Sequence, residues 1–145
     1  MNLLLKEVAY NTFKQKPKTE NIEVDLSVKF GIDKEKFEER VIFLELNMDG
    51  NTDDDDNNEP TRKLFVVAIF QYKAPLSKYE DFKKNHSEKE YREELLENQA
   101  QDDQEHLIVF LKRINDLVIN MTSFDDNRTT LDIEPAIEMY ETENV

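Results

Sequence analysis

The chain contains no cysteine and no tryptophan, and only two of its 145 residues are glycine. Without cysteine it can form neither a disulfide framework nor a thiolate metal site, which fits a reducing compartment. With so few glycines, a backbone cradle for phosphate is hard to build, and no Gly-rich phosphate loop is present. No apolar run approaches the length that spans a bilayer, and the N-terminal Met-Asn-Leu-Leu-Leu-Lys is too short for a signal peptide. We therefore expect a soluble, cytoplasmic protein without membrane insertion.

Positive charge is also scarce. The sequence has 19 Lys and Arg against 33 Asp and Glu, a formal net charge of −14. Such a field repels phosphate backbones and anionic lipid head groups, so nucleic acid and membranes are poor candidate partners. The same field favours basic partners, among them many unfolded chains, although solubility alone would also explain it.

The apolar residues of the first half are arranged for a sheet. Residues 21–30 alternate between apolar and polar side chains, which predicts a half-buried strand. Residues 37–48 and 62–74 predict two more strands, and residues 3–14 a weaker first strand that ends before turn chemistry at Pro17. The strand at 62–74 is apolar on both faces, with Leu64, Val66, Ala68, Phe70 and Tyr72 on one and Phe65, Val67 and Ile69 on the other. It therefore predicts a helix on one side and a partner subunit or a ligand on the other.

The second half is predicted to be helical. Residues 77–102 are strongly charged, and Ser87 with Glu90 fits a capping box, so we expect a mostly solvated helical insertion there. Residues 103–122 carry apolar side chains at helical spacing and predict a long helix capped by Asp103. A loop should follow, and then a short extended or helical tail that packs through Leu131, Ile133 and Ile137. The whole chain, residues 1–145, is expected to form one α+β domain: a four-stranded antiparallel sheet packed by a long C-terminal helix.

No catalytic constellation is visible in the sequence. His86 and His106 lie in charged surroundings without a nucleophile motif, and we interpret His106 as an exposed helix residue. The acidic loop at residues 49–60 contains four consecutive aspartates, from Asp53 to Asp56, which suggests calcium as one interpretation. The alternating ligand spacing and the closing glutamate are absent, so a solvated loop is the interpretation we prefer. We predict a non-enzymatic protein without catalytic residues, metal or cofactor.

The order of elements resembles SecB, the bacterial protein-export chaperone family. The stretch at residues 107–124 matches the long helix of that family, and Leu131-Asp132-Ile133-Glu134-Pro135 matches its short apolar segment. The resemblance implies a tetramer built as a dimer of dimers that binds non-native polypeptides in hydrophobic grooves without nucleotide hydrolysis. It also implies docking of the translocase motor ATPase on acidic side chains of the sheet. The insertion at 77–102 and a final helix reduced to residues 136–140 make this chain more similar to divergent members, such as chaperones dedicated to toxin–antitoxin pairs.

Three hypotheses follow for the function. The first is a holdase for unfolded or precursor polypeptides that assembles as a homo-oligomer, a dimer or a tetramer. Its candidate groove residues are Phe43, Phe65, Ile69, Tyr72 and Phe124. The second is a dedicated interaction module, such as a toxin–antitoxin-associated partner with a single client, and the third is an enzyme.

Overall fold

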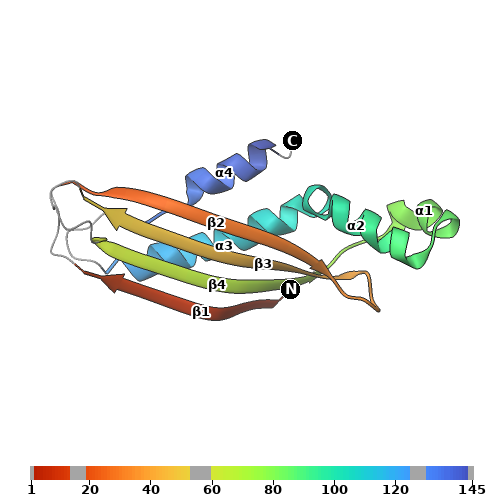
Figure 1. The fold of residues 1–145 in the computed structure, drawn as a ribbon, viewed down its shortest axis with the longest axis horizontal. Helices are drawn as coiled ribbons and strands as arrows, with labels where there is room; N and C mark the ends of the chain where they lie inside the picture. The colour runs from red at the N-terminus through yellow and green to blue at the C-terminus, as the bar shows by residue number, and fades with distance from the viewer. Residues whose placement is uncertain (1, 14–18, 53–59, 125–129, 144–145) are drawn as a thin grey trace.

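The computed structural model describes residues 2–13, 19–52, 60–124 and 130–143. These residues form one antiparallel sheet followed by helices (Figure 1). The strands are β1 (Asn2–Thr12), β2 (Asn21–Ile32), β3 (Glu39–Asn51) and β4 (Arg62–Lys73). The helices are the 3₁₀ turn η1 (Ser77–Tyr79), α1 (Glu80–Asn85), α2 (Glu88–Asp102), α3 (Gln104–Thr122) and α4 (Glu134–Glu143). The predicted α+β class, with four strands before a long helix, is confirmed.

The strand order β1-β4-β3-β2 leaves β1 and β2 at the two edges of the sheet. Strands β2, β3 and β4 follow one another as a meander, whereas β1 pairs with β4. The register of β2 against β3 is unbroken over the whole length of β2. The register of β1 shifts between Leu5 and Glu7, which makes Lys6 the extra residue of a bulge. The two edges therefore differ in regularity.

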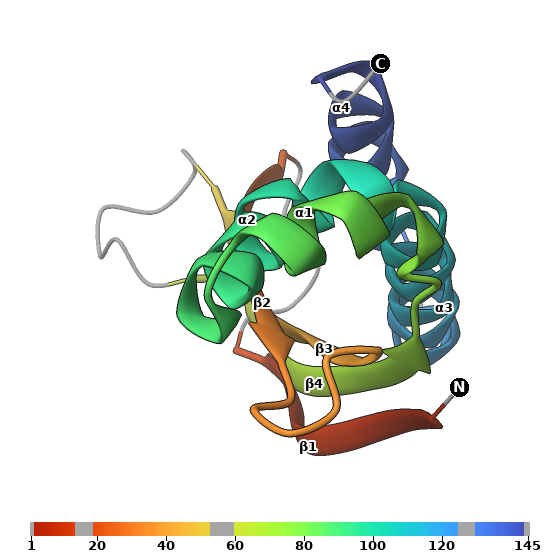
Figure 2. The same cartoon turned by 90° about the vertical axis from the view of Figure 1, so that its right-hand side faces the viewer.

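Helix α3 covers one face of the sheet, which we call the inner face (Figures 1 and 2). The alternation in β3 and β4 sends one set of side chains inward, and these are buried against α3. The largest buried apolar residues of this core include Ile42, Leu44, Leu46, Met48, Leu64, Phe70, Phe110, Leu111 and Ile114. The two faces predicted for residues 62–74 are thus confirmed, because Leu64 to Tyr72 at every second position are buried.

The opposite, outer face carries no helix among the described elements (Figure 1). Its apolar side chains, Val41, Phe43, Phe65, Val67 and Ile69, are half-buried or exposed. The doubly apolar strand predicts a packed layer on each face. Within the described residues only the inner face has one, which is α3.

The insertion η1–α1–α2 extends beyond the end of the sheet (Figure 1). Its capping box is present, because the Ser87 hydroxyl accepts from the Glu90 amide at 3.2 Å and Glu90 Oε1 accepts from the Ser87 amide at 3.1 Å. Unlike the mostly solvated helix we expected, the insertion has a small core of its own. Tyr79, Tyr91 and Leu95 are buried there against Ile32 at the end of β2.

The region after α3 corrects one expectation. Helix α4 spans ten residues rather than the five at 136–140. Two buried polar side chains of α3 hold the segment before α4: Asn115 Oδ1 accepts from the Ile133 amide at 2.8 Å, and Thr122 Oγ1 accepts from the Leu131 amide at 2.9 Å.

The turn predicted at Pro17 and the aspartates 53–56 lie outside the described residues. The start of the predicted acidic loop belongs to β3, which continues to Asn51.

Candidate functional site

The inner side of β2 carries an apolar strip that remains open at the edge of the sheet. We call this set of alternate residues the β2 strip: Ile22, Val24, Leu26, Val28 and Phe30. Ile22 and Val24 are 37% and 42% exposed, and the other three are half-buried against the core beneath α3. Exposed apolar side chains that line up along a strand are typical of a surface that docks another chain.

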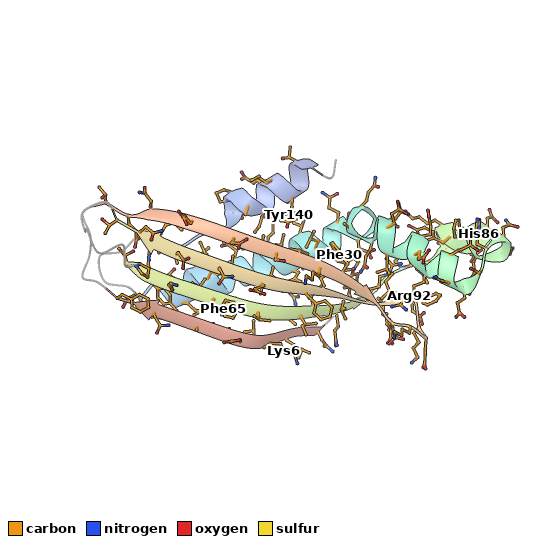
Figure 3. All side chains as sticks on the ribbon, viewed as in Figure 1. Lys6, Phe30, Phe65, His86, Arg92 and Tyr140 are labelled. Carbon is orange, nitrogen blue, oxygen red and sulfur yellow. The ribbon has the colours of Figure 1, made fainter. Side chains whose placement is uncertain are left out.

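The backbone of β2 adds a second feature to this strip. Among the described strands, β2 is paired with β3 alone, and at its C-terminal end the α2 side chains of Arg92 and Gln99 donate to the carbonyl oxygens of Ile32 and Gly31. It is twelve residues long, contains no proline and directs Glu23, Asp25 and Lys29 to the outer face. An extended polypeptide can therefore pair with β2 as a further strand and lay alternate side chains on the β2 strip. On β1 the register against β4 shifts at Lys6, which is labelled in Figure 3, so this edge is less regular than β2.

The structure distributes the groove residues predicted from the sequence over several places. Phe43, Phe65 and Ile69 lie on the outer face, and Tyr72 lies on the inner face with 4% exposure. A cavity of about 770 Å³ at the α2 end of the sheet brings Phe43 and Tyr72 together. Phe65 lines a separate cavity of about 470 Å³ with acidic neighbours, and Phe124 is 87% exposed beyond the end of α3. The role of these five residues in a client groove remains a prediction.

The β2 strip is the surface that sequence reasoning missed. Its strict alternation is visible in the sequence, and it was interpreted as the buried side of a strand. Only the strand order shows that β2 is an edge. The sequence signal that could have indicated this surface is the alternation of apolar and polar residues over 21–30, together with the acidic residues Glu23 and Asp25.

A buried polar network joins the sheet to the start of α3. Arg40 Nη1 of β3 donates to Asp103 Oδ2 at 2.7 Å, and both side chains are at most 5% exposed. The Tyr72 hydroxyl donates to the same oxygen at 3.1 Å, and Gln99 Nε2 of α2 donates to the Tyr72 oxygen at 2.9 Å. Asp103 was predicted to cap α3, but its side chain makes no capping bond and serves this network instead. The network fixes α2 on the sheet.

The two histidines stack on aromatic rings. His106 is half-buried with its ring 4.6 Å from that of Tyr72, which corrects the expectation of an exposed residue. Burial raises the pKa of Tyr72, and the nearby Asp103 carboxylate raises it further, so its hydroxyl stays a donor. His86 stacks on Phe82 at 3.7 Å, and its Nδ1 lies 2.9 Å from the Phe82 carbonyl oxygen. Within the described ranges, no three His, Cys, Asp or Glu side chains gather in a way that could hold a metal ion.

The comparisons with known proteins bear on the fold. No family model and no curated protein matches the chain. Among solved structures, it is similar to the SecB-like chaperone Rv1957 of Mycobacterium tuberculosis, which was solved in complex with a ChAD peptide from the HigA1 antitoxin Rv1956. The TM-score is 0.63 at 12% sequence identity, and the match covers 92% of this chain and 86% of the other. The chain therefore has a SecB-like fold, and the resemblance stated from the sequence is confirmed at the level of the fold.

None of the described helices combines the length and the hydropathy needed to span a bilayer.

Proposed function

We propose that this chain is a holdase that binds extended segments of non-native polypeptides along β2. The observation that carries the proposal is the β2 strip on a long, regular edge strand. A client would pair with the β2 backbone and place every second side chain on apolar surface. Neither step needs a nucleotide or a catalytic group, and both tolerate many client sequences.

The energetics of such binding follow from area and charge. Burial of apolar surface contributes about 25 cal/mol per Å², before the cost of ordering the client is subtracted. Backbone hydrogen bonds along β2 add affinity that does not depend on client sequence. The net charge of −14 speeds encounter with basic clients, and this contribution weakens with added salt. A holdase for diverse clients needs affinity of this kind, which depends little on the exact sequence of the client.

The similar solved structure supports a polypeptide as the ligand, because that chaperone was solved with an antitoxin peptide. The same observation favours the second candidate, a module dedicated to one client.

Docking of a translocase motor ATPase, and with it a role in export, stays a prediction of the resemblance alone. The carboxylates it would require are present on the outer face, at Glu23, Asp25, Glu45 and Asp49.

An aggregation-suppression assay with several unrelated denatured clients separates the two candidates. We expect the protein to protect all of them at near-stoichiometric ratios, with weaker protection of acidic clients and at high salt. Light scattering during dilution from denaturant gives the readout. Indifference to every client would contradict the holdase, and protection of a single partner would favour the dedicated module.

Self-association through β1 is part of the same proposal. Leu5 and Val8 on the inner side of β1 are 47% and 37% exposed, so burying them requires another protein surface. We expect a native mass of two or four times 17.2 kDa at micromolar concentration, and we expect Leu5→Lys to shift it toward the monomer. Native mass spectrometry or light scattering measures this. A wild-type monomer would leave the β1 surface without the proposed use.

A further inference from the structure

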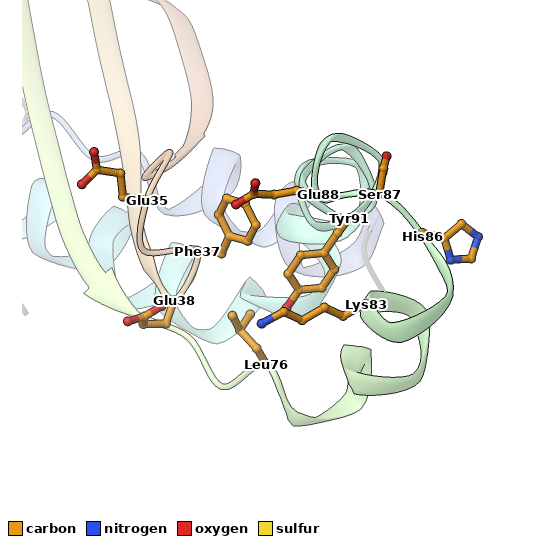
Figure 4. Close-up of a pocket in the computed structure, with 9 residues that line it drawn as sticks. All are labelled: Glu35, Phe37, Glu38, Leu76, Lys83, His86, Ser87, Glu88 and Tyr91. Carbon is orange, nitrogen blue, oxygen red and sulfur yellow. The ribbon is translucent and has the colours of Figure 1, made fainter.

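A third pocket lies away from the β2 strip, between the β2–β3 turn and the α1–α2 hairpin (Figure 4). Its volume is about 300 Å³. Three of its lining residues are apolar or aromatic and three are glutamates: Phe37, Leu76, Tyr91, Glu35, Glu38 and Glu88. We call it the insertion pocket. It exists only because the insertion packs beside the turn, so it is independent of the core under α3.

The aromatic part of the insertion pocket is rigid. The rings of Phe37 and Tyr91 lie 5.3 Å apart at an angle of 52°, and Tyr91 is only 3% exposed. Leu76 closes the base beside them (Figure 4). Aromatic faces carry a negative quadrupole and attract cations, most strongly where water is excluded.

The charges around these rings are mostly negative. Glu35, Glu38 and Glu88 are exposed at the rim, and none of them forms an ion pair with a Lys or Arg of the described ranges. Burial raises the pKa of the Tyr91 hydroxyl, the nearby Arg40 guanidinium lowers it, and the carboxylates of Glu38 and Glu80 raise it. In Figure 4 the Glu88 side chain reaches toward the Phe37 ring, whereas the side chains of Glu35 and Glu38 extend away from the centre of the pocket. Glu88 is therefore the carboxylate that the pocket presents to an aromatic ring.

One cation of the chain already occupies this kind of position. Lys83 Nζ of α1 lies 5.7 Å from the centre of the Tyr91 ring, and Lys83 is the only lysine or arginine among the pocket's described lining residues. His86 also lines the pocket, but its ring points away from the centre in Figure 4. Lys83 thus already occupies the cation position on the buried Tyr91 ring, and the half-buried Phe37 ring beside Glu88 is the aromatic surface left for a second positive charge.

We propose that the insertion pocket binds an arginine side chain of a partner polypeptide. A planar guanidinium can stack on an aromatic ring and donate two parallel hydrogen bonds to a carboxylate, which a compact ammonium cannot do. The inference rests on the proposed function in one respect, namely that the ligand is a polypeptide. Partners with an arginine near an apolar segment would then be preferred over neutral ones.

The test uses two labelled extended peptides that are identical except for one position, arginine in one and the neutral isostere citrulline in the other. Fluorescence anisotropy measures their affinities for the full chain. We expect the arginine peptide to bind roughly tenfold tighter, from a cation–π contact and an ion pair at the rim of the pocket. In Glu38→Gln/Glu88→Gln the ratio should fall to roughly threefold, because only the cation–π contact remains. The matched control Glu93→Gln/Glu97→Gln makes the same change in net charge on exposed α2 residues outside the pocket, and it should keep the ratio.

Each outcome decides one of the two proposals. Equal affinities for both peptides in the wild type, or loss of the ratio in the control variant as well, would overturn the insertion pocket as an arginine site. Binding of the citrulline peptide reports on the holdase separately, because it needs no cation site. Lys83→Met provides a further check: removing the resident cation should strengthen binding of the arginine peptide and leave the citrulline peptide unchanged.

Discussion

Asp103→Ala is expected to lower the free energy of unfolding by about 3–5 kcal/mol, the usual cost of breaking a buried ion pair on one side. The substitution leaves the Arg40 guanidinium buried without its carboxylate and removes the acceptor of the Tyr72 hydroxyl. Because Gln99 of α2 also bonds to Tyr72, we expect the amides of α2 to exchange faster as well. Denaturant unfolding and hydrogen exchange measure the two effects.

Two companion variants make this result specific. Asp116→Ala removes an exposed carboxylate from the same helix and should change stability by less than about 0.5 kcal/mol. Arg40→Met/Asp103→Leu replaces the pair with apolar side chains and should recover most of the loss. If Asp103→Ala cost no more than Asp116→Ala, the network would have no part in holding the insertion on the sheet.

Val24→Asp should weaken binding of an unfolded client by at least about tenfold. The substitution removes an apolar side chain, worth roughly 1.5–3 kcal/mol when fully buried, and obliges the client to cover a carboxylate. Since Val24 is 42% exposed in the free protein, the fold itself should tolerate the change. Anisotropy of a labelled, permanently unfolded polypeptide gives the affinity, and circular dichroism confirms that the sheet is intact.

The structure offers a matched control on the same strand. Ser27→Asp adds the same charge to β2 but on the outer face, so it should leave affinity within about twofold. Phe43→Asp tests the outer face directly, because Phe43 has the same 42% exposure as Val24. A large loss for Phe43→Asp together with none for Val24→Asp would move the client to the outer face, where three of the sequence-predicted groove residues lie.

Periodicity was sufficient to predict the elements of this fold. The alternation at 21–30 and 62–74 and the helical spacing at 103–122 are local properties, and these three elements appeared close to their expected places. The capping box at Ser87 was predicted for the same reason, since its two partners are three residues apart. The resemblance to SecB followed from the order of these elements.

The candidate sites could not be predicted in this way. The groove candidates Phe43 and Tyr72 were chosen from strand parity, which cannot say which face forms the groove, and the observed register of β3 and β4 places them on opposite faces of the sheet. Asp103 looked like a helix cap because position suggests one, but its partner Arg40 is 63 residues away in the sequence. The insertion pocket is lined by Phe37 of the β2–β3 turn and Tyr91 of α2, and no sequence pattern predicts the contact between these two rings.

The sequence by itself determined the elements, their apolar faces and the acidic character, because hydrophobic spacing and charge are written along the chain. Which strands became edges, and which apolar faces stayed in water, was decided only by tertiary structure. The physical reason is that one helix across a four-stranded sheet buries the two central strands and leaves the inner sides of β1 and β2 partly open.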